Sequence, residues 1–210
     1  VKCGIVGMPN VGKSTLFNAL SQTAQAEAAN YPFCTIEPNT GRVAVPDARL
    51  DKLAHIANSE EVIPTQLEFV DIAGLVKGAS QGEGLGNQFL SHIREVDAIL
   101  FVLRCFEDDD ITHVEGDVNP LRDFDIIQTE LVLADLESLE KRVPALEKKI
   151  RGQDKEAKAD LALIQRILPI ISDGKPARLL EIKDAEEAKR FAMLQLLTSK
   201  PAMLICNVEE

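Results

Sequence analysis

The sequence predicts an α/β fold, in which a parallel β-sheet covered by helices on both faces is interrupted by an inserted helical hairpin. Short apolar runs suited to buried strands alternate with helix-forming segments through residues 1–125. Between residues 126 and 197 the apolar residues recur at helical spacing. We therefore expect a sheet domain formed by residues 1–125 and 198–210, and an inserted helical coiled-coil domain formed by residues 126–197.

The expected elements follow from their apolar patterns. The strands are expected at Cys3–Val6, Arg42–Val45, Leu67–Asp71, Ala98–Leu103 and Pro201–Cys206. Outside the hairpin, helices are expected at Ser14–Leu20, Asn87–Glu95 and, capped by Asp184 with Glu187 three residues later, 185–197.

The inserted hairpin is expected to consist of a helix over residues 126–150, a break at Arg151–Asp154 and a second helix that carries Ala157, Leu161, Ile164 and Leu168. Pro144 should kink or interrupt the first helix. Basic residues gather near the tip, with acids among them. They indicate either a solvated helix face or a docking surface for an acidic partner such as RNA.

Length and composition agree with this architecture. The chain has 210 residues, of which 45% are hydrophobic, so it can form one large domain or a domain that carries an insertion. Its formal net charge of −11 excludes a surface that is basic throughout. No apolar run approaches the roughly 20 residues that span a bilayer, and no signal peptide is visible before the first strand. We expect no membrane partner.

The four cysteines do not form a C-x-x-C pair. Three of them lie in or beside apolar, strand-like runs, where cysteine usually behaves as a small buried hydrophobic residue. We therefore expect neither a zinc site nor a disulfide, and we expect a reducing, cytoplasmic location.

The segment Gly7–Thr15 completes the pattern G-x-x-x-x-G-K-[ST], the phosphate-cradling P-loop. An apolar strand precedes it and a helix follows it, which disfavours a chance Gly-Lys-Ser turn. Glycines let the backbone curl so that its N–H groups converge on a polyphosphate, and the helix N-terminus adds positive potential. The phosphate-binding residues are expected to be Asn10, Val11, Gly12, Lys13, Ser14 and Thr15. Lys13 would reach the β- and γ-phosphates, and the Ser14 hydroxyl would bind Mg²⁺.

A second phosphate motif, D-x-x-G, follows the strand that ends at Asp71. Asp71 is expected to hold Mg²⁺ directly or through a water, and the Gly74 N–H is expected to meet the γ-phosphate. Thr35, in the loop after the first helix, would complete the metal shell; the alternative is an ordinary loop threonine. The glycine-dense segment Gly74–Gly86 is a natural switch that the γ-phosphate would order. These motifs predict a GTPase-like P-loop nucleoside triphosphatase fold.

Two departures from the common GTPase pattern affect catalysis and base choice. Leu75 stands where small GTPases place the glutamine that orients water, so another group must position the nucleophile or turnover must be slow. The base-binding motif N-K-x-D is replaced by Asn207-Val208-Glu209-Glu210. Glu210 is one methylene too long for the paired hydrogen bonds to guanine, which weakens the case for GTP and opens the case for ATP.

Taken together, these residues closely resemble the YchF or Obg-like ATPase family within the translation-factor-related P-loop GTPases. The most specific segments are Gly7–Ser14, Asn30–Asn39, Phe69–Ser80, Gly82–Phe89 and Asn207–Glu210. The resemblance implies a GTPase-type fold with a coiled-coil insertion, ATP preferred over GTP, a hydrophobic residue at the Leu75 position, and association with ribosomal RNA or proteins. It also implies that His113 assists hydrolysis; by itself, a lone loop histidine is more often a surface residue.

The family continues beyond the base-binding motif into further elements and a C-terminal TGS domain, so we expect this chain to be a truncated form with an unpaired sheet edge. Three functions stay open: an ATP-hydrolysing molecular switch, a GTPase of the same fold, and a binding module that nucleotide only gates. In the first, Lys13, Gly74 and His113 are the catalytic candidates, Mg²⁺ is the cofactor, and the protein is expected to be a monomer.

Overall fold

The computed structural model describes residues 1–28, 40–72, 85–107 and 117–209. Within them one mixed sheet has the spatial order β2-β3-β1-β4-β5. The strands are β1 (Lys2–Val6), β2 (Thr40–Ala44), β3 (Gln66–Asp71), β4 (Ala98–Arg104) and β5 (Ala202–Asn207). The α-helices are α1 (Lys13–Ala28), α2 (Ala48–Ala57), α3 (Leu85–Glu95), α4 (Pro120–Arg151), α5 (Lys155–Ser172) and α6 (Ala185–Met193). Short 3-10 helices, η2 (Ala177–Leu179) and η3 (Leu197–Ser199), flank α6.

The sheet is parallel except at one edge. Strands β3, β1, β4 and β5 run parallel to one another, as the alternation of strands and helices predicts. The predicted parallel-sheet fold is confirmed, and the one departure from it among the described strands is β2, which pairs antiparallel with β3. Strands β2 and β3 are joined by a connection that contains α2 (Ala48–Ala57).

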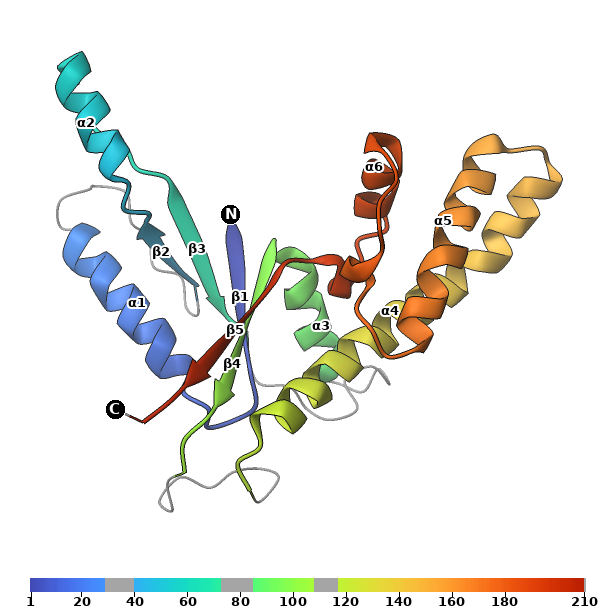
Figure 1. Cartoon of the computed structure of the whole chain (residues 1–210), viewed down its shortest axis with the longest axis horizontal. Helices are drawn as coiled ribbons and strands as arrows, with labels where there is room; N and C mark the ends of the chain where they lie inside the picture. Colours follow the sequence, from blue (N-terminus) through green and yellow to red (C-terminus); the bar gives the residue numbers. More distant parts are fainter. Residues whose placement is uncertain (29–39, 73–84, 108–116, 210) are drawn as a thin grey trace.

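Helices lie on both sides of the sheet (Figure 1). Helix α1 packs on β1, β2 and β3, α3 packs on β1, and the start of α4 packs on β4. The first apolar cluster fills these layers and includes the fully buried Ile5, Val6 and Ile93. Phe101 of β4 and Phe124 of α4 meet edge to face, with their ring centroids 5.1 Å apart. This core fixes the carboxyl ends of the parallel strands along one edge of the sheet.

Helices α4 and α5 form the expected hairpin, which extends away from the sheet in Figure 1. The Asp154 side chain caps α5 by accepting hydrogen bonds from the N–H groups of Glu156 (3.0 Å) and Ala157 (3.1 Å). A second apolar cluster, formed around Leu139, Leu163, Ile164, Ile167 and Ile171, holds the hairpin together. The helix expected to begin near residue 126 begins at Pro120, where Asn119 accepts a hydrogen bond from the Arg122 N–H.

Two expectations for the helices are wrong, namely an interruption at Pro144 and an end of α6 near Leu197, whereas the kink expected as the alternative at Pro144 stays a prediction. Helix α4 continues through Pro144 without interruption, since Val143 and Leu146 on either side pack against the second cluster. Helix α6 ends at Met193 rather than near Leu197, because Gln195 adopts a left-handed conformation with φ of 52°.

The division into a sheet domain and an inserted domain stays a proposal. The presence of two separate apolar clusters supports it. Helix α4 contributes to both, with Leu131 in the first and Val132 in the second, so the boundary crosses this helix. In the described part of the chain, no helix is both long enough and apolar enough to cross a membrane.

A buried carboxylate ties the inserted helices to β5. Asp135 of α4, 1% exposed, accepts hydrogen bonds from the Leu197 N–H (2.8 Å), the Thr198 N–H (2.8 Å) and the Thr198 hydroxyl (2.7 Å). The Thr198 Oγ1 in turn accepts a hydrogen bond from the Ala177 N–H at 2.9 Å. Burial raises the pKa of Asp135, whereas the hydrogen bonds oppose that change. The carboxylate therefore fixes η2 and η3, the approach to β5, against α4.

We expect Asp135→Ala to lower the free energy of unfolding by about 3 kcal/mol, because it leaves buried donors without an acceptor. Urea unfolding followed by circular dichroism measures the loss. Glu140→Ala, which removes an exposed carboxylate from the same helix, is the matched control. Equal stabilities of the two variants would show that the buried carboxylate does not hold the segments together.

Candidate nucleotide-binding site

The loop between β1 and α1 is curled tightly. Asn10 and Gly12 both have left-handed backbones, with φ of 62° and 95°. The Gly12 carbonyl accepts the first hydrogen bond of α1, from the Leu16 N–H at 2.9 Å. A β-carbon at Gly7 would lie 2.5 Å from the Val102 carbonyl oxygen of β4, so only glycine fits there. The loop therefore adopts the anion-cradling form predicted from the P-loop pattern.

The Lys13 side chain folds back across this loop. Its Nζ donates hydrogen bonds to the carbonyl oxygens of Gly7 (3.1 Å) and Met8 (3.2 Å). Burial lowers the pKa of Lys13, and the nearby carboxylate of Asp71 opposes that shift. The ammonium group is thus held at the mouth of the loop by two weak acceptors, which a phosphate oxygen can replace with a charge-assisted bond.

Ser14 and Asp71 meet beside the loop although they are far apart in the sequence. The Ser14 Oγ donates a hydrogen bond to the Asp71 Oδ2 at 3.3 Å. The other carboxylate oxygen, Asp71 Oδ1, is buried and has no hydrogen-bond partner among the described residues. A hydroxyl and an unsatisfied carboxylate oxygen are ligands that Mg²⁺ prefers. The two residues therefore fit the metal role predicted for them.

Asn207 braces the P-loop from β5. Its Nδ2 donates a hydrogen bond to the Val11 carbonyl oxygen at 3.1 Å. The same nitrogen would lie 2.5 Å from a β-carbon at Gly12, so the glycine lets this side chain approach. The motif expected to bind the base thus also fixes the phosphate loop.

A pocket of about 870 Å³ lies between the P-loop, the end of β4 and the end of β5. It is lined by Asn10, Gly12, Thr15, Phe106, Glu107, Asn207, Val208 and Glu209. The pocket thus borders both the segment predicted to bind phosphate and the segment predicted to bind the base, at the carboxyl ends of neighbouring parallel strands, where α/β proteins commonly bind ligands.

Phe106 and Glu107 are pocket residues that the sequence reasoning missed. The Arg104 guanidinium lies over the Phe106 ring, 4.8 Å from its centroid, and the Arg104 Nε donates a hydrogen bond to the Phe106 carbonyl oxygen at 3.1 Å. These contacts hold the aromatic ring beside the pocket. In the sequence, the available signal for these two pocket residues was that they directly follow β4, a strand that lies next to the strand before the P-loop.

The structure brings together most of the predicted site. Lys13, Ser14 and Asp71 lie together at the P-loop, and Asn207 and Val208 line the pocket beside it. Thr35, Gly74, Leu75, His113 and Glu210 lie outside the described residues. Their proposed roles therefore stay predictions.

Comparisons with known proteins agree with this geometry. A family profile described as 50S ribosome-binding GTPase matches residues 2–135. Proteins named ribosome-binding ATPase YchF from Pasteurella multocida and Bacillus subtilis are 58% and 54% identical to this chain over 209 and 207 residues. Those matches cover 100% and 99% of this chain, but only 57% and 56% of the relatives. The chain therefore spans little more than half the length of these relatives.

A solved structure shows the same fold over the whole chain. The structure of the Schizosaccharomyces pombe YchF GTPase matches with a TM-score of 0.82 and 44% identity, covering 100% of this chain and 57% of that one. The predicted GTPase-like fold and the resemblance to the YchF or Obg-like ATPases are thereby confirmed.

We expect Asn207→Asp to weaken nucleotide binding about tenfold, because it replaces the donor to the Val11 carbonyl by an acceptor and frees the P-loop. Titration with a fluorescent ADP analogue measures the affinity. Asn58→Asp, an identical change in the exposed C-cap of α2, should leave the affinity unaltered. Equal affinities of the two variants would contradict the bracing role.

Proposed function

We propose that this chain, which belongs to the family of 50S ribosome-binding GTPases, binds a nucleoside triphosphate with Mg²⁺ and hydrolyses it slowly as a molecular switch. The observation that carries this proposal is Asp71 Oδ1, which lies beside Ser14 at the mouth of a curled P-loop, is buried, and has no hydrogen-bond partner among the described residues. A bound cation would supply a partner for a buried carboxylate oxygen of this kind.

The phosphate end of the site supports phosphoryl transfer to water. Lys13 would exchange its two carbonyl partners for β- and γ-phosphate oxygens, and the loop N–H groups would stabilise charge on the transferred group. Ser14, Asp71 and, in our proposal, Thr35 would hold Mg²⁺, which neutralises phosphate charge when it is bound. We retain Gly74 as a γ-phosphate donor and His113 as an aid to hydrolysis.

The base end of the site supports ATP over GTP. Val208, 63% exposed in the pocket, stands where GTPases carry a lysine, and Phe106 offers a braced aromatic face for stacking a base. Neither side chain selects guanine by hydrogen bonds. We infer that ATP binds there with its base against Phe106 and Val208, while Glu210 does not reproduce the guanine-binding aspartate.

The cellular role is carried over from the relatives as a proposal. They are named ribosome-binding ATPases, so we propose that this switch associates with ribosomal RNA or proteins in the cytoplasm. A GTPase of the same fold is the second candidate, which the name of the matching family favours.

We expect calorimetric titration in the presence of Mg²⁺ to show ATP binding at least about tenfold tighter than GTP. The physical reason is the loss of the paired acceptor for guanine. If GTP binds about tenfold better instead, the GTPase candidate replaces the ATPase. If neither nucleotide binds, the proposed function is wrong for this chain.

We expect Asp71→Asn to raise the Mg²⁺ concentration required for ATP binding, and to slow single-turnover hydrolysis, each by about 10- to 100-fold. Asparagine keeps the shape of aspartate but lacks its charge. Magnesium titrations of ATP binding and hydrolysis measure both effects. Asp51→Asn, which neutralises an exposed acid of α2, should behave like the unaltered chain. An unchanged magnesium dependence in Asp71→Asn would remove this residue from the metal site.

A further inference from the structure

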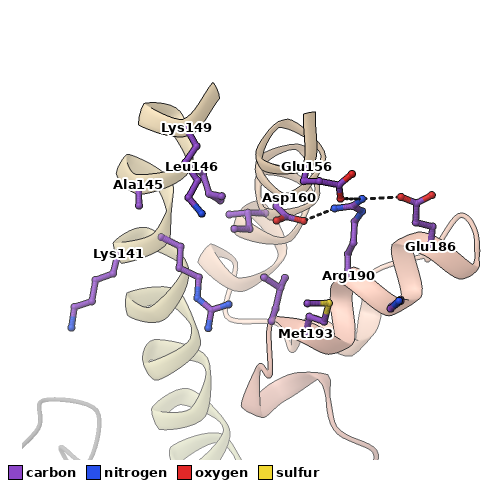
Figure 2. A pocket seen from close by; sticks show the side chains of 13 residues that line it. Lys141, Ala145, Leu146, Lys149, Glu156, Asp160, Glu186, Arg190 and Met193 are labelled. Atoms are coloured by element: carbon purple, nitrogen blue, oxygen red, sulfur yellow. Dashed lines mark hydrogen bonds and ion pairs between the residues drawn. The ribbon is translucent and has the colours of Figure 1, made fainter. Parts of the chain in front are cut away.

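A groove of about 790 Å³ lies between α4, α5 and α6, on the inserted helices rather than at the nucleotide site (Figure 2). Its floor is apolar. Ile164 belongs to the second cluster, and Leu146 packs against it. Met193 of α6 also lines the groove and is 72% exposed. A methionine that is exposed above an apolar floor can adapt to an incoming hydrophobic surface.

The α4 wall of the groove is basic. Lys141 is already paired with Glu137 one turn earlier, at 2.5 Å. Arg142 and Lys149 also line the groove, and neither has an ion-pair partner among the residues that the structure describes. This wall therefore presents two uncompensated positive charges in a chain whose formal net charge is −11.

The opposite wall carries three acids, Glu156, Asp160 and Glu186, together with Lys189 and Arg190. Arg190 of α6 bridges to Glu156 and Asp160 of α5 and to Glu186 of its own helix, with the last two contacts at 2.9 and 2.8 Å (Figure 2). These ion pairs connect α6 to α5 on the side of the groove that faces α4. Three carboxylates sharing one guanidinium would repel a phosphodiester backbone.

We propose that this groove binds an amphipathic α-helix of a partner protein, with its apolar stripe on the Leu146, Ile164 and Met193 floor and its acidic flank against Arg142 and Lys149. Grooves between helices commonly accept a helix through apolar anchors spaced three and four residues apart. The basic wall supplies charge complementarity, and the apolar floor favours a protein over RNA. The inference does not depend on the nucleotide site.

The test uses the whole chain without nucleotide and a synthetic helical peptide of about 18 residues, with leucines along one face, glutamates along one flank and glutamines elsewhere. Fluorescence anisotropy of the labelled peptide should give a dissociation constant on the order of 10 μM. A peptide with lysine in place of every glutamate should bind about tenfold more weakly, although the chain as a whole is acidic.

Two pairs of variants locate the binding. Lys149→Glu and Met193→Glu should each weaken binding of the acidic peptide about tenfold. Lys148→Glu makes the same change at an exposed position outside the groove, and Leu179→Glu places a glutamate at another exposed apolar position outside it; both controls should stay within about twofold. Thermal unfolding checks that all four variants fold.

Three results would overturn the proposal. The acidic peptide could fail to bind at about 1 mM, the lysine peptide could bind as tightly, or the controls could lose binding equally. An RNA hairpin that binds the chain and is released by Lys149→Glu, with no peptide binding, would assign the surface to RNA instead. Because no nucleotide is present, these outcomes leave the proposed hydrolysis untouched.

Discussion

The candidate site depends on how closely the P-loop backbone approaches its neighbours. Gly7 lies against the Val102 carbonyl of β4, and Gly12 lies against the Asn207 amide of β5. A side chain at either position would push the loop away from the strand that supports it. The phosphate cradle is therefore shaped by the order of β1, β4 and β5 in the sheet, and not by the loop sequence alone.

The same dependence connects the inserted helices to the site. Asp135 of α4 holds Leu197 and Thr198, which directly precede β5, and β5 ends at the Asn207 that braces the P-loop. Hydrogen bonds of 2.7–3.1 Å form the two ends of this connection, at Asp135 and at Asn207. Between them, β5 pairs with β4 over its whole length. A continuous set of contacts therefore runs from α4 through β5 to the P-loop backbone.

The sequence predicted the parts of the molecule whose chemistry is local. A glycine-rich pattern between a strand and a helix, and an aspartate that ends a strand, locate Lys13 and Asp71 without any tertiary information. Three features could not be predicted without the three-dimensional structure, because each depends on residues distant in the chain. They are the antiparallel direction of β2, the contacts of Asp135 and the position of Phe106 beside the pocket. The start of α4, in contrast, is marked locally in the sequence, because Asn119 followed by Pro120 is a typical helix-start pattern.

An acidic chain can bind a polyphosphate because the local groups decide the field at the site. Exposed acids are screened over about 8 Å at physiological ionic strength, so the overall charge of −11 acts weakly inside a pocket. There, the loop N–H groups, the α1 N-terminus and Lys13 face the ligand within a partly buried space, where electrostatic interactions are stronger than in water. Burial lowers the pKa of Lys13, and the carboxylate of Asp71 beside it opposes that shift. Asp71 and Ser14 would hold a Mg²⁺ ion here, whose positive charge would reduce the repulsion between the carboxylate and a bound polyphosphate.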